Sequence, residues 1–290
     1  MRNDRLLCLL VAFAAAGLFG CNTSSPLPPH HASPQPSAYS HHDTLTLARL
    51  KDIREARAAI RQNLNHAQTP GYRAIRPVFV ASRRTSPSLV LRRDHDTTGP
   101  VVTTGRALDL MIEGKGFFQS SHANGGVFYT RAGALYLNRD GELVLGSTKG
   151  PALTSGIFVP DDALSVSVSY DGSVRITNPD GTTTDVGQIE LTIFISPEGL
   201  VEITPGQFVE TSNSSPPLTG FPGEGAFGTI LQGHLEQSNV DLYQETLELD
   251  RLRVWELALA RSIDLDPAML ERPRPIETQT RNATMSHLDH

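Results

Sequence analysis

Short β-branched segments separated by Asp-Gly or Asn-Gly pairs fill the middle of the chain, from residue 99 to residue 233. These dipeptides are strong hairpin signals, because the tight turns that join antiparallel strands need residues with positive φ. Several such hairpins in succession predict an antiparallel sheet or barrel. We expect the stretch 211–228, rich in Pro, Ser and Gly, to be a long surface loop. The expected strands include residues 126–130, 165–170, 173–177 and 188–195, and the expected turns are Asn124-Gly125, Asp140-Gly141, Asp171-Gly172, Asp180-Gly181 and Glu198-Gly199.

Helices are predicted on both sides of this β region. Residues 44–66 contain neither Gly nor Pro, and apolar residues recur there at the three-and-four spacing of one helix face. The same spacing recurs near the other end of the chain. Each apolar stripe is interrupted once by a charged residue, the first at Arg57 and the second at Glu256. The stripes consist of Leu50, Ile53, Ile60, Leu64 and Ala67, and of Leu242, Leu249, Leu252, Leu259 and Ile263.

The two predicted helical regions carry opposite charge. Between residues 49 and 93, eleven Arg and Lys residues stand against two acids, whereas residues 241–266 contain seven acids and three Arg. A narrow apolar stripe on an otherwise charged helix is typical of a helix that packs against another helix. We therefore expect each helix to be the other's partner. The alternative is that both helices simply pack on the β domain.

The first 21 residues have the organisation of a bacterial lipoprotein signal peptide. Two Arg residues precede an apolar run over 6–18, which ends at Leu18-Phe19-Gly20-Cys21. This run is shorter than the roughly 20 residues that a helix needs to cross a bilayer. We expect cleavage before Cys21 and acylation of its thiol, although Phe19 is larger than the residue usual at that position. Ordinary secretion, a short uncleaved anchor and a misread start codon are the alternatives.

The segment that follows, residues 22–42, is predicted to be a tether, because Pro, Ser, His and Asn leave it little to bury. The pairs His30-His31 and His41-His42 fit that composition better than a metal site. Removal of the first 20 residues would leave 23 basic and 30 acidic residues and a formal charge of −7. Nucleic acid is therefore not an expected partner.

No motif in the sequence predicts catalysis or a cofactor. With Cys8 removed and Cys21 acylated, no thiol would remain for a disulfide, a metal site or nucleophilic catalysis. The chain contains neither His-Glu-x-x-His nor Gly-x-Ser-x-Gly. Residues 223–228 match Gly-x-Gly-x-x-Gly, but a phosphate cradle requires a helix after it, and residues 229–231 read as a strand. We expect no catalytic residue, no metal, no cofactor and no small-molecule substrate.

Asn63-Leu64 followed by Thr69-Pro70-Gly71-Tyr72-Arg73 resembles the Asn-rich signature that ends the first helix of bacterial flagellar rod and hook proteins. In such a signature the Asn and Thr side chains can satisfy the last helix carbonyls and the turn, and Gly71 permits the chain reversal. The match is partial, so helix packing there is expected to differ from the family. The departures are Arg61, Gln62, Asn65, His66 and Gln68.

A longer set of segments resembles the β domain and the last helix of the same family, and its order and spacing are most similar to the distal rod protein. Arg253-Val254-Trp255-Glu256 stands where the family has Arg-Ala-Tyr-Glu, so that Trp255 keeps an aromatic anchor but lacks the hydroxyl. The β-domain segments are residues 104–109, 112–119, 129–133, 138–143, 187–191 and 232–241.

The resemblance implies a mainly β fold, in which an antiparallel β domain is flanked by N- and C-terminal helices that form a coiled coil. It implies a structural component of the flagellar basal body that acts by self-association in the periplasmic axle, with other rod, hook or ring proteins as partners. The assembly residues would be Leu50, Ile53, Ile60, Leu242, Leu249, Leu252, Trp255 and Leu259, and the family-motif residues Asn63, Leu64, Thr69, Pro70, Gly71 and Tyr72.

The lipoprotein-like start conflicts with this picture, because rod proteins of the family normally leave the cell through the flagellar export channel without a cleaved signal. The alternative function is therefore a lipid-anchored envelope adaptor that uses a rod-family fold as a binding module and does not polymerise. The departures in the helices favour the adaptor, and the near-complete β domain favours the rod component. Asn22, which follows the lipidated cysteine, favours the outer membrane as the location of the expected anchor.

These inferences divide the chain into seven parts. They are the signal peptide (1–20), a disordered tether (21–43), the N-terminal helix with the rod signature (44–73), a linker (74–98), the β-rich domain (99–235), the C-terminal helix (236–270) and a disordered tail (271–290).

Overall fold

The computed structural model describes residues 41–80, 88–122 and 125–263, so the predictions for the signal peptide, for Cys21 and for the C-terminal tail lie outside the described residues. Helices α1 (His41–Asn65) and α2 (Leu242–Ser262) begin and end this part of the chain, and η1 (Pro197–Gly199) is a short 3-10 helix. The strands are β1 (Ile75–Val80), β2 (Ser88–Arg93), β3 (Val101–Thr103), β4 (Leu110–Glu113), β5 (Phe117–Ser121), β6 (Val127–Thr130), β7 (Leu135–Leu137), β8 (Leu143–Leu145), β9 (Ala152–Leu153), β10 (Ser165–Val168), β11 (Ser173–Thr177), β12 (Thr183–Gln188), β13 (Leu191–Ile193), β14 (Val201–Thr204), β15 (Gln207–Val209), β16 (Leu218–Gly220), β17 (Thr229–Gln232) and β18 (His234–Glu236).

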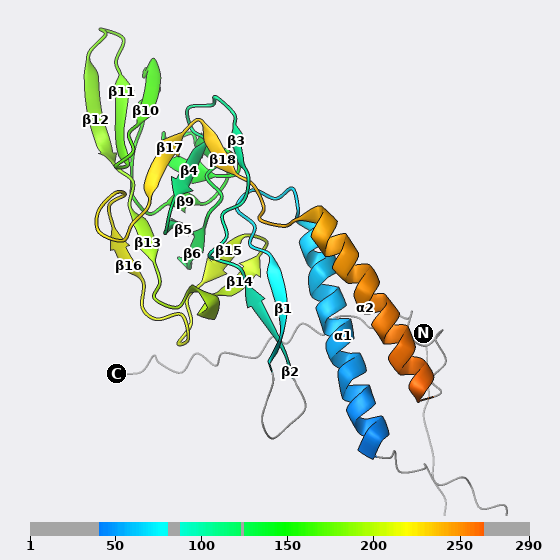
Figure 1. Cartoon of the computed structure of the whole chain (residues 1–290). Coiled ribbons are helices and arrows are strands. Elements are labelled where there is room, and N and C mark those ends of the chain that lie inside the picture. Colours follow the sequence, from blue (N-terminus) through cyan, green and yellow to red (C-terminus); the bar gives the residue numbers. More distant parts are fainter. Residues whose placement is uncertain (1–40, 81–87, 123–124, 264–290) are drawn as a thin grey trace, which may run out of the picture. The chain divides into compact units, whose positions relative to one another are not determined.

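The predicted antiparallel β domain with two helices is confirmed, since the strands of the described chain pair antiparallel (Figure 1). The largest sheet has the order β14-β15-β6-β5-β9-β8-β7, and β13 joins it through β5. Strands β10, β11 and β12 form a separate three-stranded sheet. Its turns contain Gly172 and Gly181 at φ of 81° and 83°, as the Asp-Gly signals predicted.

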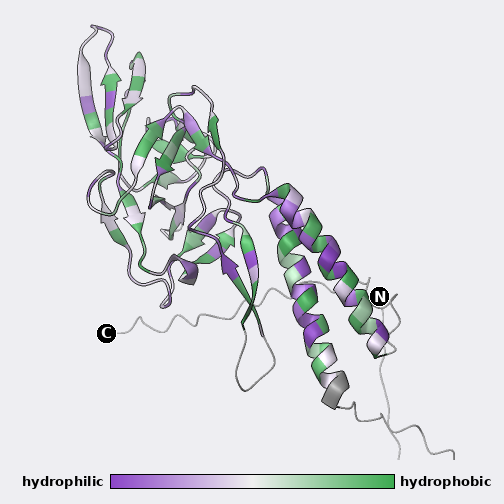
Figure 2. Cartoon of the chain, viewed as in Figure 1, coloured by the Kyte–Doolittle hydropathy of each residue, from purple (hydrophilic) through white to green (hydrophobic). Residues whose placement is uncertain are grey.

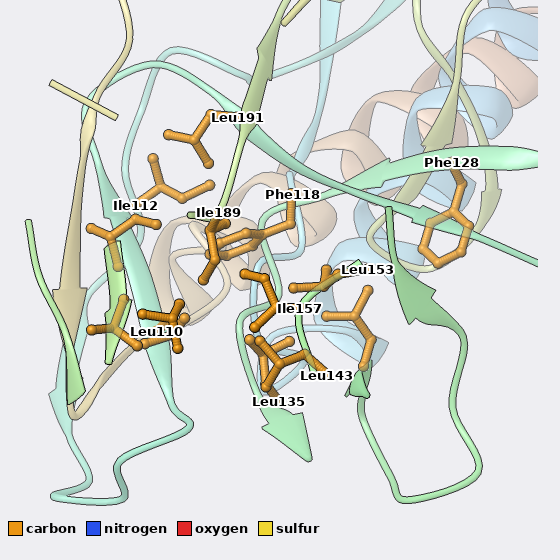
Figure 3. Close-up of a cluster of buried hydrophobic side chains, with 14 residues drawn as sticks. Leu110, Ile112, Phe118, Phe128, Leu135, Leu143, Leu153, Ile157, Ile189 and Leu191 are labelled. Atoms are coloured by element: carbon orange, nitrogen blue, oxygen red, sulfur yellow. The ribbon is translucent and has the colours of Figure 1, made fainter. Parts of the chain in front are cut away.

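Aliphatic side chains from many short strands form the main core of the β domain. Leu110 and Ile112 of β4, Phe118 of β5 and Leu191 of β13 are fully buried, and Figure 3 shows them converging with leucines of β7, β8 and β9. Short strands of this kind depend on such shared burial, because a two-stranded hairpin is marginally stable alone. The core therefore stabilises the sheet that supports the helix junction described below.

A second cluster, here called the aromatic cluster, packs on the opposite face of β5. Phe117 and Phe118 are neighbours in sequence, but their side chains point to opposite faces because side-chain direction alternates along a strand. The rings of the cluster meet edge to face, for example Tyr129 and Phe194 at 4.8 Å between centroids. Its members are Phe117, Tyr129, Phe194, Leu200 and Phe208.

Helices α1 and α2 lie side by side and run antiparallel (Figure 1). Ile53, Ala56 and Ile60 of α1 pack with Leu252 of α2 in a buried cluster. Figure 2 shows polar and apolar residues mixed along both helices. In residues 41–80, 88–122 and 125–263, neither helix has the length together with the apolarity that crossing a membrane requires.

The segment predicted as a linker, residues 74–98, contains instead the antiparallel hairpin β1–β2, in which Phe79 is opposite Leu89. Pro77 in β1 made this strand difficult to predict from the sequence. Proline has no N–H to donate to a neighbouring strand, so its presence argues against a strand. Here β1 belongs to a two-stranded sheet and has a free edge, where Pro is tolerated. Leu89 packs against the core of the helix pair, which explains why the hairpin lies beside α1.

Three further predictions need correction. The C-terminal helix begins at Leu242 and not at residue 236, because β18 ends at Glu236 and Asp241 caps α2 by accepting hydrogen bonds from the N–H groups of Tyr243 and Gln244. The expected loop 211–228 contains β16, which pairs with β13. Glu198-Gly199 lies in η1, and the hairpin turn between β14 and β15 is formed by Pro205-Gly206, with Gly206 at φ 77°.

Candidate functional site

The end of α1, the start of α2 and one edge of the β domain meet in a buried polar region, here called the helix junction. It is formed by Asn63, Gly71, Tyr72, Arg73, Glu236 and Asn239, which come from two segments far apart in the sequence. Asn63, Gly71 and Tyr72 were predicted as motif residues. Glu236 and Asn239 were recognised only as part of a longer segment that resembles the family.

Asn63, in the last turn of α1, closes the loop that follows the helix. Its Oδ1 accepts the Ile75 N–H and its Nδ2 donates to the Ile75 carbonyl, both at 2.8 Å. Nδ2 also donates to Oε2 of Glu245 on α2 at 3.1 Å, and the Tyr72 hydroxyl donates to Oδ1 at 3.3 Å. We expected Asn63 to satisfy the last helix carbonyls. Its side chain instead pairs with the first residue of β1 and so joins both helices to the hairpin.

Gly71 brings the loop against the β domain in a conformation that favours glycine. Its φ is 69°, and its N–H donates to the carbonyl of Glu236 at 2.9 Å. A Cβ at this position would lie 2.4 Å from the backbone nitrogen of Ala132. Both the backbone angle and the close approach therefore require glycine at position 71.

The remaining motif residues lie around this loop. Leu64 packs against the core of the helix pair, and Pro70 is half-buried. The Thr69 carbonyl accepts the N–H of Tyr72 at 3.2 Å, and its hydroxyl lies 3.3 Å from Nδ1 of His66. His66 departs from the family signature, and its ring stacks on Tyr72 with centroids 5.1 Å apart. His66 therefore contributes a contact to the junction.

Glu236 pairs with two buried arginines at the centre of the junction. Oε1 lies 2.8 Å from Nη1 of Arg73, and Oε2 accepts from Nε of Arg131 at 2.8 Å. Arg131 also donates to three backbone carbonyls, and Oε1 accepts the N–H of Gly99 at 3.0 Å. Burial lowers the pKa of Arg73, and the Glu236 carboxylate opposes that shift. Buried charges of this kind are tolerated only where they are paired and hydrogen-bonded.

Polar contacts that no sequence pattern predicted extend the junction toward α2. Asn239 accepts the Ala74 N–H at 2.6 Å and donates to the carbonyls of Asp94 and Thr97, both at 2.9 Å. Nη1 of Arg76 donates to Oε1 of Glu245 at 2.6 Å. No spacing in the sequence indicates these partners, because residues 76 and 245 meet only through the fold.

The interface between α1 and α2 contains most of the predicted assembly residues. Leu50, Ile53, Ile60 and Leu252 are buried, and Leu249 and Leu259 are partly buried against the same cluster. Glu256 is 2% exposed and pairs with Arg57 and, at 2.9 Å, with Nε of Arg54. The two residues that interrupt the stripes are therefore partners of each other.

Two predicted assembly residues, Leu242 and Trp255, lie outside this interface. Leu242 is exposed in the first turn of α2, where Glu245 occupies the buried side and contacts Asn63. Trp255 is exposed on a different side of α2, and the guanidinium of Arg251 lies 4.6 Å from its ring centroid. The spacing that selected Leu242 extends the stripe into the first turn of α2, where Glu245 makes the contact with α1 instead.

The contacts described in the junction and in the helix interface join the elements of the fold. In the part of the chain that the structure describes, no group of three or more His, Cys, Asp and Glu residues is placed to hold a metal ion. The glycines of residues 223–228 lead into β17, as the sequence predicted, and a phosphate cradle would require a helix there.

Comparisons with known proteins agree with this geometry. Residues 111–176 match the family model described as flagellar hook protein FlgE/F/G D1 domain. The chain is 39% identical over 156 residues to the flagellar basal-body rod protein FlgG of Bacillus subtilis, which covers 53% of this chain and 59% of that protein. It is 35% identical over 159 residues to FlgG of Agrobacterium fabrum, with 54% and 60% covered. The chain thus spans about 60% of the length of these two relatives.

A third relative is matched over a larger share of its length. The chain is 30% identical over 179 residues to FlgG of Buchnera aphidicola subsp. Acyrthosiphon pisum, which covers 61% of this chain and 67% of that protein. These matches confirm the resemblance that the sequence segments carried, and the family model includes β5 to β10, which supply part of the main core. The chain belongs to the family of flagellar basal-body rod proteins FlgG, within the flagellar rod and hook proteins.

Proposed function

We propose that the chain is a structural component of the flagellar basal-body rod that acts by self-association through its helix pair. Its relatives are named as basal-body rod proteins, and residues 111–176 of the β domain match the family model described as flagellar hook protein FlgE/F/G D1 domain. The single observation that carries the proposal is the outer side of α2, where the apolar residues Leu247, Val254 and Ala258 stay exposed after α1 has packed against the other side.

The outer side of α2 carries Leu247, Val254 and Ala258, and the exposed Arg251 lies among them. Their spacing places them on one face of the helix, opposite Leu252. Leu247 is 49% exposed and Val254 is 64% exposed, with Trp255 next to them. A helix that is apolar on two sides and covered on one is typical of a helix that packs with more than one neighbour.

We take a second copy of this chain as that neighbour, because the matched relatives are rod proteins. The exposed side of α1 is mainly basic, with Arg49, Lys51 and Arg61, and the outer side of α2 carries Glu248 and Asp250 beside Arg251 and Arg253. Packing of α1 of one copy against α2 of the next would place Glu248 and Asp250 near the basic residues of α1. Other rod, hook or ring proteins of the basal body would then contact the ends of such an assembly.

Val254→Asp tests the proposal without disturbing the contact between α1 and α2. A charge in an apolar interface should weaken self-association of the full chain by about tenfold or more, equivalent to about 1.4 kcal/mol. The unfolding free energy should change by less than about 0.5 kcal/mol, because Val254 is exposed in the single chain. Ile195→Asp, at an exposed apolar position of the β domain, is the matched control. Unchanged association of the Val254 variant in analytical ultracentrifugation would refute this use of α2.

We propose in addition that Cys21 carries a lipid and that residues 22–42 tether the helix pair to a membrane, with the outer membrane favoured by Asn22. The support is the order of basic residues, apolar run and cysteine at the start of the sequence. An acyl chain gains roughly 0.8 kcal/mol per buried CH₂ in a bilayer, so the lipidated end would stay in the membrane and outside a packed rod. Cys21→Ser should abolish labelling with radioactive palmitate and move the protein out of the membrane fraction. Unchanged fractionation would exclude the anchor.

The envelope-adaptor alternative has less support, because the matched relatives are rod proteins. It shares the lipid anchor but predicts no self-association. The Val254→Asp experiment therefore separates the two functions, since an adaptor would sediment as a single chain before and after the substitution.

A further inference from the structure

His95 has an environment that suits a neutral imidazole and no other form. Its ring lies edge to face with Phe117 and Phe208 of the aromatic cluster, with centroids 5.8 and 5.0 Å apart. Both ring nitrogens are buried, and neither has a hydrogen-bond partner among the residues that the structure describes. A polar group buried without a partner is costly, so the position is expected to have a reason beyond packing.

The backbone on both sides of His95 is fastened to the helix junction. The N–H of Asp94 donates to the Ala74 carbonyl at 2.9 Å, and the Asp94 carbonyl accepts from Asn239. The carbonyl of Thr97 accepts from Nη1 of Arg73 at 2.6 Å and from Asn239 at 2.9 Å. Residues 94–97 therefore contact the junction through their backbone, while the His95 ring inserts into the β domain.

The charges around the ring are mainly positive. Arg73 comes from the loop after α1, Arg93 from the end of β2 and Arg131 from the loop after β6, and the carboxylate of Asp94 opposes them. Strands β5 and β15, which present Phe117 and Phe208, contain no charged residue. Burial, followed by Arg73 and Arg93, lowers the pKa of His95 from 6.5 to about 3. A protonated ring would add a fourth cation to this region.

We propose that His95 is a pH-sensitive lock, which holds residues 94–97 and the helix junction against the aromatic cluster while its imidazole is neutral. Protonation requires the ring to leave the cluster, and the backbone that Arg73 and Asn239 hold moves with it. The closed form, with the ring in the cluster, binds fewer protons than the open form, in which the ring has left it. A lower pH therefore favours the open form. The opening equilibrium constant should rise up to about tenfold per pH unit as the pH falls from 6.5 toward 3. At neutral pH the coupling between helix pair and β domain is rigid, and in acid it loosens.

Hydrogen exchange of the full chain between pH 7 and pH 4 tests the lock, after correction for the intrinsic rates. The reporters are the junction amides of Ala74, Asp94 and Gly99, each of which donates across the junction. In the wild type their protection factors should fall with decreasing pH, by up to about tenfold per unit, whereas the amide of Ile230 in the main core should keep its protection. His95→Phe keeps an aromatic ring without a titrating group and should remove this pH dependence.

His122→Phe is the matched control, because His122 lies 4.5 Å from the Phe128 ring and outside the junction. It should keep the wild-type profile. Junction protection that does not change between pH 7 and pH 4 in the wild type, or the same loss in the His95 variant, would overturn the proposal. Should His95→Phe not fold, an NMR titration of the wild-type ring decides, since a ring that titrates near pH 6.5 in the folded chain would also overturn it.

Discussion

Arg57 and Glu256 form an ion pair in the middle of the α1–α2 interface, although each interrupts an otherwise apolar stripe of its own helix. Glu256 is almost fully buried, and Arg57 is 15% exposed at its side chain. A buried pair adds little stability relative to well-packed apolar residues, but it penalises any arrangement that separates the two charges. The pair therefore favours one register between the helices, in the way that a single polar residue selects the register of a coiled coil.

Removal of one partner of this pair should destabilise the protein. Glu256→Leu leaves the Arg57 guanidinium without its carboxylate, and we expect the free energy of unfolding in urea to fall by about 3 kcal/mol. The double variant Arg57→Leu with Glu256→Leu should recover most of this loss. Arg54→Ala is the control, because Arg54 contacts the same carboxylate from a more exposed position and should cost less than about 1 kcal/mol. A single Glu256→Leu variant as stable as the wild type would contradict the role of the pair.

Gly71→Ala should disrupt the contact between the loop after α1 and the β domain. Gly105 has the same φ of 69°, but a Cβ added there would have nothing within 4 Å, so Gly105→Ala isolates the cost of backbone strain, about 1 kcal/mol. Gly71→Ala adds a collision with the backbone of Ala132 and should cost at least about 2 kcal/mol more. Chemical denaturation of both variants gives the difference. Equal losses would mean that the loop does not need its close approach to Ala132.

Glu236→Gln should lower the free energy of unfolding more than the loss of an exposed ion pair does. The substitution removes the charge that balances Arg73 and Arg131, and we expect a loss of about 3 kcal/mol in unfolding free energy. Asp185→Asn, which breaks the exposed pair of Asp185 with Arg175, should change stability by less than about 0.5 kcal/mol. Hydrogen exchange at Gly99 reports the local effect, since its N–H donates to Glu236. If both variants unfold alike, the buried triad has no special role.

Periodicity predicted the parts of this fold that local sequence determines. The apolar stripes predicted both helices, and the Asp-Gly pairs predicted the turns at Gly172 and Gly181. Pro77 concealed a strand, because its cost depends on whether that edge of the strand is paired. The spacing of apolar residues also does not show where along a helix the contact with its partner ends. Leu242 was therefore predicted to lie in the interface, although it is exposed.

The helix junction was less accessible to prediction. The signature around Gly71 indicated a chain reversal, but Asn63 also contacts Glu245, 182 residues away along the chain, and Glu236 contacts Arg131, 105 residues away. His95 carried no signal at all, since its environment is composed of strands β5 and β15 and of arginines from three other segments. Long-range burial of a polar group is a property of the assembled fold and is not visible in residue spacing.

Detection of this chain in purified basal bodies tests the proposed rod function most directly. Basal bodies from cells that produce the wild type, Val254→Asp or Ile195→Asp should be compared by quantitative mass spectrometry, with the established rod and ring proteins as internal standards. We predict that the wild type and the Ile195 variant co-purify at a constant ratio to these proteins and that the Val254 variant is lost. Basal bodies that are otherwise complete and lack the wild-type chain would contradict the account.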